Sequence, residues 1–464
     1  MNIKEKLKKV VIVGAGPAGL AAAYTLAKNK NLSITLIDQG RAVKQRLCPS
    51  PERCIRCNFC HKKLGFGGAG AFSDGKFVFE TIIGKRAIGS NLHEIIGITQ
   101  EQEYLKKARL MFEKYFGTKV SIPDKELLKK ASNIAQVAAG NDMDYILALN
   151  HHMGTDKLPE LMEKIQKNLL SLGVKIITCE KIENFDDKKV YSKERSYEFD
   201  YLILAPGRDG CIWLENLLRE HNLEYEIRPI DIGFRIETDA LAIKHLTDVQ
   251  RDVKLSFRRP NGDLIRTFCM CPYGMVTREK CSGGFNLVNG ASDSKKLSPN
   301  TNFALLLTMP LKYNSRTNTY AELIAKLYYE AGADKPVIQR YGDLKNDRRS
   351  KDTQVSEWRV QPTLKDVIVG DVGIAMPYRI VRALIYGIEK LSAKGLMHGL
   401  NSDSTLLYAP EIKFHGIKVK TNEYLASLAM PNVYFAGDGS GISRGIGGAA
   451  ASGILAAEGI LRDN

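Results

Sequence analysis

The residues best suited to chemistry are cysteines, of which the 464-residue chain contains nine. Four of them, Cys48, Cys54, Cys57 and Cys60, lie close together, and the last three are spaced C-x-x-C-x-x-C. Thiolates at such intervals can converge on one iron–sulfur cluster or one zinc ion. The same spacing also fits a redox-active thiol pair or plain buried thiols. All three interpretations stay open, and the metal or cluster site is the prediction that these four residues carry.

A second group of thiols is the pair Cys269 and Cys271, which flank Met270. On the strand that we expect here, two residues that are two positions apart share one face. A thiol beside a bound redox cofactor could relay electrons or add to a substrate. The alternative is a pair of small core residues. Cys269 and Cys271 are therefore the catalytic candidates.

A glycine-rich turn near the N-terminus predicts nucleotide binding. Gly14-Ala15-Gly16-Pro17-Ala18-Gly19 follows an apolar strand and opens a helix, as the G-x-G-x-x-G fingerprint requires. Gly14 permits the tight turn, Gly16 lets the backbone approach a diphosphate, and Gly19 lets helix and strand pack closely. Asp38 ends the second strand, where a carboxylate can accept hydrogen bonds from a ribose and disfavours the extra phosphate of NADP.

The C-terminal segment Asn432-Val-Tyr-Phe-Ala-Gly-Asp438 predicts a second contact with the same ligand. A glycine-flanked acid at a strand end can approach a polyol chain and accept hydrogen bonds from its hydroxyls. The helix expected from Gly445 would point its positive dipole end, with Ile446, Gly447 and Gly448, at the ligand. Arg444, just before this helix, could meet a carboxylate or phosphate of a substrate.

These motifs together resemble the FAD oxidoreductases related to glutathione reductase and hydroxybenzoate hydroxylase. The first motif is GAGPAGL with Asp38, the middle one is YLILAPG with Ala205 and Gly207, and the last is YFAGDGSG with Gly437 and Asp438. The resemblance implies that both ends of the chain bind one FAD. No second strand-bound G-x-G-x-x-G occurs, so a nicotinamide donor, NAD(P)H, would bind transiently over the flavin.

A second resemblance covers nearly the whole chain. The segment from Cys48 to Lys76, FCMCPYG (268–274) and QRYGDLKNDRRS (339–350) are similar to a family of uncharacterised FAD-dependent dehydrogenases. In related flavoproteins the glycine-rich loop at this point of the chain lies along the flavin. The expected FAD-binding residues are Gly14, Gly16, Pro17, Ala18, Gly19, Asp38, Gln39, Gly70, Ala71, Gly75, Ala205, Gly207, Gly437, Asp438, Ile446, Gly447 and Gly448.

The resemblance implies an oxidoreductase that transfers hydride or electrons through flavin N5 to or from a small molecule. Two alternatives belong to other classes. One is an electron carrier or redox sensor that combines flavin with an iron–sulfur cluster on the cysteines. The other is a lipid reductase akin to geranylgeranyl reductases, for which a long apolar tunnel would be the sign. The sequence leaves the substrate and the oligomeric state open.

Charge and hydropathy limit the partners. The formal net charge is +15, but the basic residues form no dense run and no aromatic residues are interleaved with them, so we expect no nucleic acid partner. A lysine-coated surface is the simplest explanation, and an anionic substrate or a peripheral membrane contact stays open. No run of about 18 apolar residues occurs and the N-terminus reads as a first strand, so we expect a cytoplasmic protein.

The elements that must position these residues belong to an α/β fold. Val10–Val13, Ala18–Lys28 and Ser33–Ile37 predict one strand-helix-strand unit. We expect a discontinuous Rossmann-like FAD-binding domain (1–213 and 401–464) that carries an inserted mixed α/β substrate domain (214–400). Alternating segments such as KLSFRRP and LIRTFCMCP predict antiparallel strands in the insertion. A long strand is expected at Tyr197–Ala205, and Leu110 is expected to be buried in a helical region.

Overall fold

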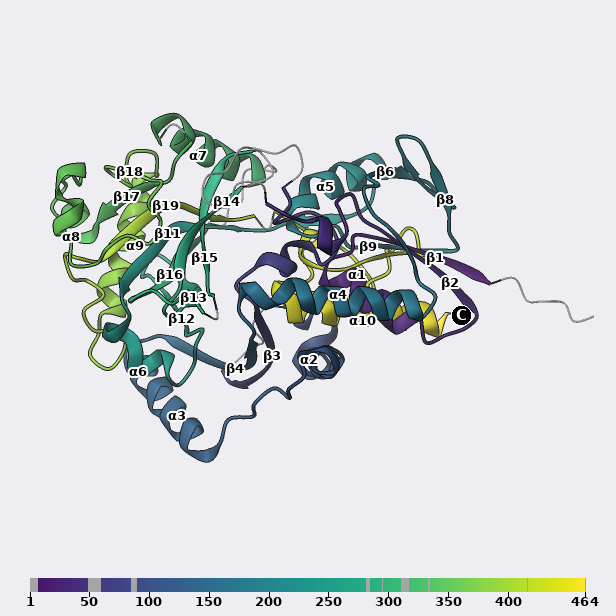
Figure 1. Ribbon diagram of the computed structural model, residues 1–464, viewed down its shortest axis with the longest axis horizontal. Helices are drawn as coiled ribbons and strands as arrows, with labels where there is room; N and C mark the ends of the chain where they lie inside the picture. Colours follow the sequence, from purple (N-terminus) through teal and green to yellow (C-terminus); the bar gives the residue numbers. More distant parts are fainter. Residues whose placement is uncertain are drawn as a thin grey trace, which may run out of the picture.

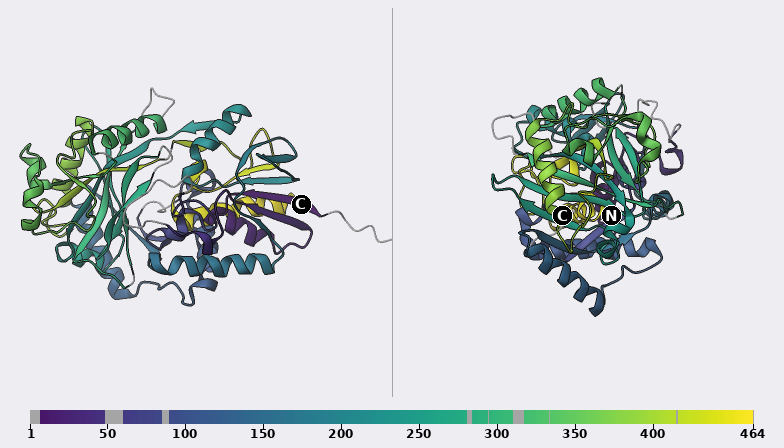
Figure 2. Two further views of the ribbon diagram at one scale, coloured as in Figure 1. Left: turned by 45° about the horizontal axis from the view of Figure 1, so that its top comes forward. Right: turned by 90° about the vertical axis from the view of Figure 1, so that its left-hand side faces the viewer.

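The computed structural model describes residues 7–48, 60–84, 90–280, 284–293, 295–309, 317–332, 334–414 and 416–463. These residues form two bodies that lie side by side along the long axis of the molecule, each around its own large sheet (Figure 1). The views in Figure 2 show the same division from two other directions.

The first body is a five-stranded parallel sheet in the order β21-β9-β1-β2-β5. Its central strand is an uninterrupted apolar run in which Val10, Val11 and Ile12 are at most 2% exposed, as expected for a strand covered on both faces. The expected strand-helix-strand unit is confirmed. The strands are β1 (Lys8–Val13), β2 (Leu32–Ile37), β5 (Lys175–Ile177), β9 (Tyr201–Leu204) and β21 (Val433–Phe435).

Small residues bring two helices of this body into close contact. Helix α1 follows β1 and helix α10 ends the described chain, and both are rich in alanine and glycine. The expectation for Leu110 is wrong, because its side chain is 47% exposed on the outer face of α2. The helices of this body are α1 (Pro17–Leu26), α2 (His93–Phe116), α4 (Leu158–Ser171), α5 (Cys211–Glu220) and α10 (Gly445–Arg462).

The strand expected at Tyr197–Ala205 is in fact two strands. β8 (Ser196–Glu198) pairs with β7 (Lys189–Ser192), which also pairs with β6 (Ile182–Phe185), in a three-stranded antiparallel sheet. The chain then changes partners at Asp200, whose carboxylate accepts the backbone N–H of Lys9 at 2.6 Å. Of these two strands, only β9, which follows Asp200, joins the parallel sheet.

The second body is a nine-stranded sheet in the order β18-β17-β19-β11-β16-β13-β12-β4-β3. Two ten-residue strands, β11 and β16, are antiparallel neighbours at its centre. The predicted antiparallel pair in the KLSFRRP and LIRTFCMCP segments is confirmed as β12 and β13. The strands are β3 (Lys76–Ile83), β4 (Asp144–His152), β11 (Ile230–Asp239), β12 (Lys254–Arg258), β13 (Leu264–Cys271), β16 (Asn300–Met309), β17 (Val337–Arg340), β18 (Ile368–Val369) and β19 (Leu406–Lys413).

Helices cover this sheet, and a separate two-stranded hairpin, β14-β15, lies against its strand β19. Helix α9 (Tyr378–Leu391) packs an apolar face that includes Ile380, Leu384 and Ile388 on the central strands. A second short pair of strands, β10 and β20, links the two bodies. The remaining elements are α3 (Lys125–Ala139), α6 (Lys244–Thr247), α7 (Thr317–Gly332), α8 (Tyr341–Lys345), β10 (Tyr225–Ile227), β14 (Met275–Lys280), β15 (Asn286–Ala291) and β20 (Ile417–Val419).

The edges of the nine-stranded sheet do not coincide with the expected boundaries at 213/214 and 400/401. Strands β3 and β4 precede residue 214, and β19 follows residue 400, yet all three belong to this sheet. The chain therefore passes between the two large sheets four times, from β2 to β3, β4 to β5, β9 to β11 and β19 to β21. Among the described residues, no helix is both long and apolar enough to cross a membrane.

Candidate functional site

A large cavity lies where the two bodies meet. Its empty volume is about 1810 Å³, counting the part open to solvent. One wall is formed by loops at the carboxyl ends of the parallel strands, where ligands of open α/β sheets bind. The other wall is formed by β13, the β14-β15 hairpin and the starts of β3 and β12.

Most residues expected to bind the cofactor line this cavity, although they come from distant parts of the chain. The turn after β1, the loop after β9 and the loop after β21 converge there because their strands are parallel neighbours. The expected residues that line the cavity are Gly14, Gly16, Pro17, Ala18, Asp38, Gln39, Gly70, Ala205, Gly207, Gly437, Asp438, Ile446 and Gly447.

Four expected residues lie behind the cavity wall instead. A Cβ on Gly19 would stand 1.9 Å from the carbonyl oxygen of Gly14, which is the close helix–strand packing expected of this position. Ala71 is fully buried, and a Cβ on Gly75 would meet the backbone of Gly154 at 2.7 Å. Gly448 is buried within α10. These residues shape the cavity without facing it.

Two carboxylates hold the loops at the nucleotide side. Asp38 accepts the backbone N–H groups of Ala15 and Gly40, each at 2.8 Å, so it ties the glycine turn to the end of β2. Burial raises the pKa of Asp38, and the two backbone hydrogen bonds oppose this rise. Asp438 lies 3.2 Å from Arg208 Nε and accepts a hydrogen bond from Ser443 Oγ at 3.0 Å.

A buried arginine fixes the glycine-rich loop that the sequence placed along the cofactor. Arg46 is 1% exposed and donates hydrogen bonds to four carbonyl groups of the loop: Nε to His61 at 3.0 Å, and Nη1 to Phe66 at 2.6 Å, Gly68 at 2.9 Å and Gly65 at 3.4 Å. Its planar, branched donor set suits several carbonyl groups at once. The loop continues into a short 3-10 helix, η2 (Gly68–Phe72), at the cavity wall.

The wall contributed by the second body is charged. Lys76 Nζ lies 3.2 Å from Asp74 Oδ2 and 3.2 Å from Asp252 Oδ2, and Asp252 also pairs with Lys254 at 2.7 Å. Burial opposes the charge on Lys76, but Asp252 and Asp74 outweigh it and raise the pKa of the ammonium group. These four side chains are at most 11% exposed.

A second ionic cluster lies beside the first. Glu279 is within 3.2 Å of Lys63 and 3.8 Å of Lys413, and it accepts a hydrogen bond from Asn289. Although burial opposes it, the attraction of Lys63, Lys413 and Arg208 holds the pKa of Glu279 below its usual range. This carboxylate is therefore ionised.

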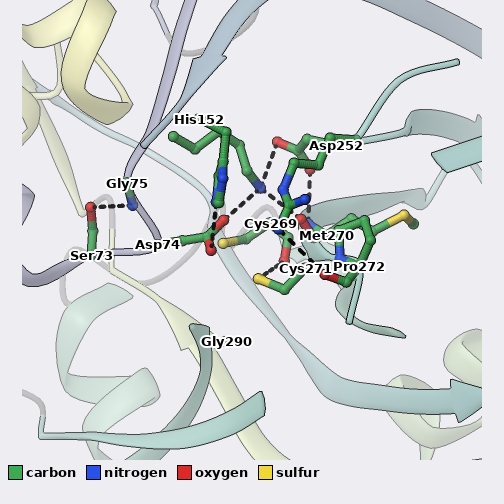
Figure 3. Close-up of polar contacts among 12 residues, drawn as sticks. Ser73, Asp74, Gly75, His152, Asp252, Cys269, Met270, Cys271, Pro272 and Gly290 are labelled. Atoms are coloured by element: carbon green, nitrogen blue, oxygen red, sulfur yellow. Dashed lines mark hydrogen bonds and ion pairs between the residues drawn. The ribbon is translucent and has the colours of Figure 1, made fainter. Parts of the chain in front are cut away.

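The two catalytic candidates from the sequence are brought together with an acid. One atom each of Asp74, Cys269 and Cys271 lies within 4.8 Å of the others (Figure 3). Cys269 lines the cavity, whereas Cys271 is fully buried behind it. His152 Nε2 lies 3.4 Å from Asp74 Oδ1, while the ring of His151 stacks on Phe116, so the adjacent histidines face opposite ways.

An arginine pair closes the same wall. Arg266 Nη2 bonds to Asp231 Oδ2, and Arg444 Nη1 lies 3.6 Å from the same oxygen. Thr308 donates to the other oxygen of Asp231 at 2.6 Å. Burial, followed by repulsion from Arg266, lowers the pKa of Arg444 to about 10. Both guanidinium groups are therefore charged at neutral pH and share one carboxylate.

The residues present fit a flavin dinucleotide. The N-termini of α1 and α10 both reach the cavity, and neither helix has an acidic residue in its first turn or a side chain that caps it. Unpaired N–H groups and the positive end of a helix dipole attract a diphosphate or an anionic ring edge. One N–H of α10 is engaged, since Gly445 donates to Asp438 at 3.3 Å. Gly14, with a φ of +107°, leaves no room for a side chain, because a Cβ there would stand 2.1 Å from Ala205 O.

Sequence reasoning missed most of the charged wall. Asp74 and Lys76 flank Gly75 in the segment already assigned to the cofactor, and Arg208 directly follows Gly207. Their position next to expected cofactor residues was a signal in the sequence that could have identified them. Arg266 and Phe268 alternate with buried Ile265 and Thr267, so the period of two on β13 marks its cavity face.

The predicted metal or cluster site lies partly outside the described residues. Cys54 and Cys57 lie outside the described residues, so this site stays a prediction. Cys48 and Cys60 are described as free, partly exposed thiols.

Two family models match different parts of the chain. Residues 8–210 match the family described as pyridine nucleotide-disulphide oxidoreductase. Residues 229–413 match the family described as FAD-dependent protein, C-terminal domain-like.

Similar proteins extend over the full length. An uncharacterised protein of Clostridium beijerinckii is 27% identical over 492 residues, covering 98% of this chain and 81% of the relative. Among solved structures, the chain is similar to glycine oxidase from Bacillus cereus, with 10% identity, 98% and 96% of the two chains covered and a TM-score of 0.38. The chain is also similar to L-proline dehydrogenase from P. horikoshii, with 12% identity, 99% and 94% of the two chains covered and a TM-score of 0.42.

Proposed function

The chain is an FAD-dependent oxidoreductase, and from this premise we propose that it oxidises or reduces a small anionic molecule bound by Arg266 and Arg444. When bound, FAD supplies hydride or electron-pair exchange at its N5 atom. The chain supplies the position of the substrate and the electrostatic environment.

The observation that carries this proposal is that two guanidinium groups share the carboxylate of Asp231. Asp438 also attracts Arg444, but it already pairs with Arg208, so three guanidinium groups share two carboxylates and one positive charge is left over. Arg444 also has a buried Nε without a hydrogen-bond partner. An unsatisfied buried donor of a charged group is unfavourable by about 1–3 kcal/mol or more. An anion in the cavity would balance the remaining charge.

The arginine pair lies where the two bodies meet, because Arg444 directly precedes α10 of the first body and Arg266 comes from the second. Arg266 lies on β13 of the second body, whereas Gly14, Gly16 and Asp38 belong to the first. The ring of Phe268, two residues further along β13, lines the cavity with three cations around it: Lys254, Arg266 and Lys413, at 5.0, 5.1 and 5.7 Å from its centre. A flat anionic substrate could stack on this ring and direct its carboxylate or phosphate to Arg266.

The charged lining favours a polar substrate over a prenyl chain. Seven basic and six acidic side chains line the cavity. A long hydrocarbon chain would have to displace water from these groups without replacing its hydrogen bonds, which is unfavourable. The charged lining therefore disfavours a lipid reductase. Among the described strands there is one five-stranded parallel sheet of the dinucleotide-binding kind, so an NAD(P)H donor would share the cavity with FAD.

Anion titration of the FAD-loaded protein tests the proposal. Acetate, benzoate and inorganic phosphate would be added separately while the visible absorbance of the flavin is followed. We expect a saturable change with at least one of them. Arg266→Met should weaken that binding at least about tenfold, which corresponds to about 1.4 kcal/mol. Arg359→Met, a change at an 81% exposed side chain, is the control and should bind the anion as the wild type does. Equal affinity in Arg266→Met and wild type, or no response to any anion, would contradict the proposal.

A further inference from the structure

We propose that Cys269 and Cys271 form a redox-active dithiol that reacts with small-molecule disulfides entering the cavity. Cys269 is the attacking sulfur and Cys271 is the resolving sulfur. This inference goes beyond the proposed function, because it concerns a different pair of residues and needs no anion site.

The backbone around Cys269 is irregular, and this irregularity positions the two thiols. The register between β13 and β16 slips between Phe268 and Cys271, and Cys269 has a φ of +49°. A positive φ is uncommon outside glycine, and such conformations cluster at functional sites. Bulges of this kind re-aim side chains next to active sites. Here the bulge sets Cys269 into the cavity wall and keeps Cys271 close behind it.

Three hydrogen bonds to buried charged groups hold the bulge in place. Arg235 Nη2 donates to the carbonyl of Cys269 at 2.8 Å, and Lys76 Nζ donates to the carbonyl of Met270 at 2.8 Å. Asp252 accepts the N–H of Met270 at 2.8 Å. Two of these three groups, Lys76 and Arg235, are also the cations that act on the Cys269 thiol. Figure 3 shows Asp252 and Met270 beside the two cysteines.

These cations also favour a thiolate at Cys269. The Arg235 side chain is fully buried and also donates to Cys271 Sγ at 3.4 Å, and the Lys76 side chain is 8% exposed. A hydrogen bond from the Cys271 thiol lowers the pKa of Cys269, and Lys76 and Arg235 add to this against the effect of burial. The same hydrogen bond raises the pKa of Cys271. The two thiols therefore differ in the direction that an attacking and a resolving sulfur require.

The exchange balances when the second departing substrate sulfur, which receives no proton from the pair, takes one from solvent. The Cys269 thiolate attacks one sulfur of the disulfide, the bond between the two substrate sulfurs breaks, and one substrate thiolate leaves. Cys271 then attacks the Cys269 sulfur and displaces the second substrate sulfur, while its proton passes to one of the two departing thiolates. The protein pair loses two electrons and forms one internal disulfide, and the substrate disulfide gains them and becomes two thiols.

A metal ion is the competing explanation for the three clustered groups. Asp74, Cys269 and Cys271 have ligand types that zinc accepts. However, Lys76 forms an ion pair with Asp74, and Arg235 bonds to Cys271. A divalent cation would be placed beside two buried positive charges. The electrostatics therefore favour the dithiol.

Redox titration of the FAD-loaded protein tests the inference. The reduced protein would be equilibrated anaerobically with glutathione and glutathione disulfide at increasing ratios, quenched with iodoacetamide and examined by peptide mass spectrometry. We expect a Cys269–Cys271 disulfide to form in a single two-electron transition. Cys271→Ser should instead trap glutathione on Cys269, and Cys269→Ser should give neither product. Cys179→Ser, at an exposed thiol, is the control and should titrate as the wild type does.

Three outcomes would overturn the inference. The pair could stay reduced when glutathione disulfide is in large excess, or Cys271→Ser could carry no glutathione. The protein could also contain one zinc per chain and show these thiols to iodoacetamide only after chelation. Flavin absorbance and far-ultraviolet circular dichroism of each variant show that it is folded, so a loss of reactivity can be assigned to the thiols.

Discussion

Gly453 of α10 and Ala18 of α1 are in backbone contact: a Cβ built on Gly453 would stand 2.0 Å from the carbonyl oxygen of Ala18. The last helix therefore lies directly on the first helix of the nucleotide turn. Since both helices point their N-termini at the cavity, this contact fixes the two dipoles relative to one another.

Gly453→Ala should separate the two helices. An added methyl group at this distance forces the backbone to shift, which typically lowers the free energy of unfolding by about 1–3 kcal/mol. We expect a lower urea midpoint and less FAD per chain after purification. Gly140→Ala is the control, because Gly140 has a φ of −62° and a Cβ there would meet its nearest atom at 3.5 Å. If Gly453→Ala retained full FAD and stability, the packing described here would be wrong.

Arg46→Met should loosen the glycine-rich loop. It removes four hydrogen bonds between a buried cation and carbonyl groups of the loop, at His61, Gly65, Phe66 and Gly68. Leaving such groups unpaired should lower the free energy of unfolding by about 2–4 kcal/mol. Limited proteolysis should show faster cleavage within residues 60–72. Arg41→Met, at an exposed neighbouring position, should change neither property.

Acid should destabilise the protein through Asp74. Burial opposes its charge, but Lys76 and a hydrogen bond from His152 hold the pKa of Asp74 below its usual value in the folded state. A depressed pKa contributes stability above the unfolded value of about 3.9 and loses it as the pH falls toward the folded value. The urea midpoint should therefore drop as the pH is lowered from about 5.

Asp74→Asn should flatten that pH dependence. It breaks a buried ion pair, so it should also lower the free energy of unfolding at pH 7 by about 3 kcal/mol. Asp352→Asn, at an exposed position, should keep the wild-type profile. A variant with the same slope below pH 5 as the wild type would exclude Asp74 as the source.

The backbone at Cys269 can be tested by two substitutions of opposite character. Asparagine tolerates a positive φ, whereas valine, which is β-branched, does not. Cys269→Val should therefore be less stable than Cys269→Asn by about 1–2 kcal/mol, measured by urea unfolding at a constant slope. Equal midpoints would mean that Cys269 does not adopt the left-handed conformation.

The nucleotide side of the cavity could be predicted from the sequence because its determinants are local. Gly14 to Gly19 lie within one turn, and the strand and helix around them have strong apolar patterns. Gly207 and Gly437 follow parallel strands, so once the strands were assigned, their common edge followed.

The charged wall depends on contacts that the local pattern does not encode. Lys76 and Asp252 are 176 positions apart, and they meet because β3, β4 and β12 are neighbours in one sheet. The pairing of β4 with β12 is set by packing of the whole sheet. His152 shows the same difficulty: its partner Asp74 lies on a segment 78 positions earlier.

The repeated passage of the chain between the sheets limits how this protein can be divided. A fragment that spans only residues 229–413 would lack β3 and β4, and the backbone groups of β12 that pair with β4 would become an open sheet edge. Such an edge invites pairing between chains and aggregation. The second body is therefore not one continuous part of the chain, and exchanging it for that of a relative requires moving two separate stretches together, one with β3 and β4 and one from β11 to β19.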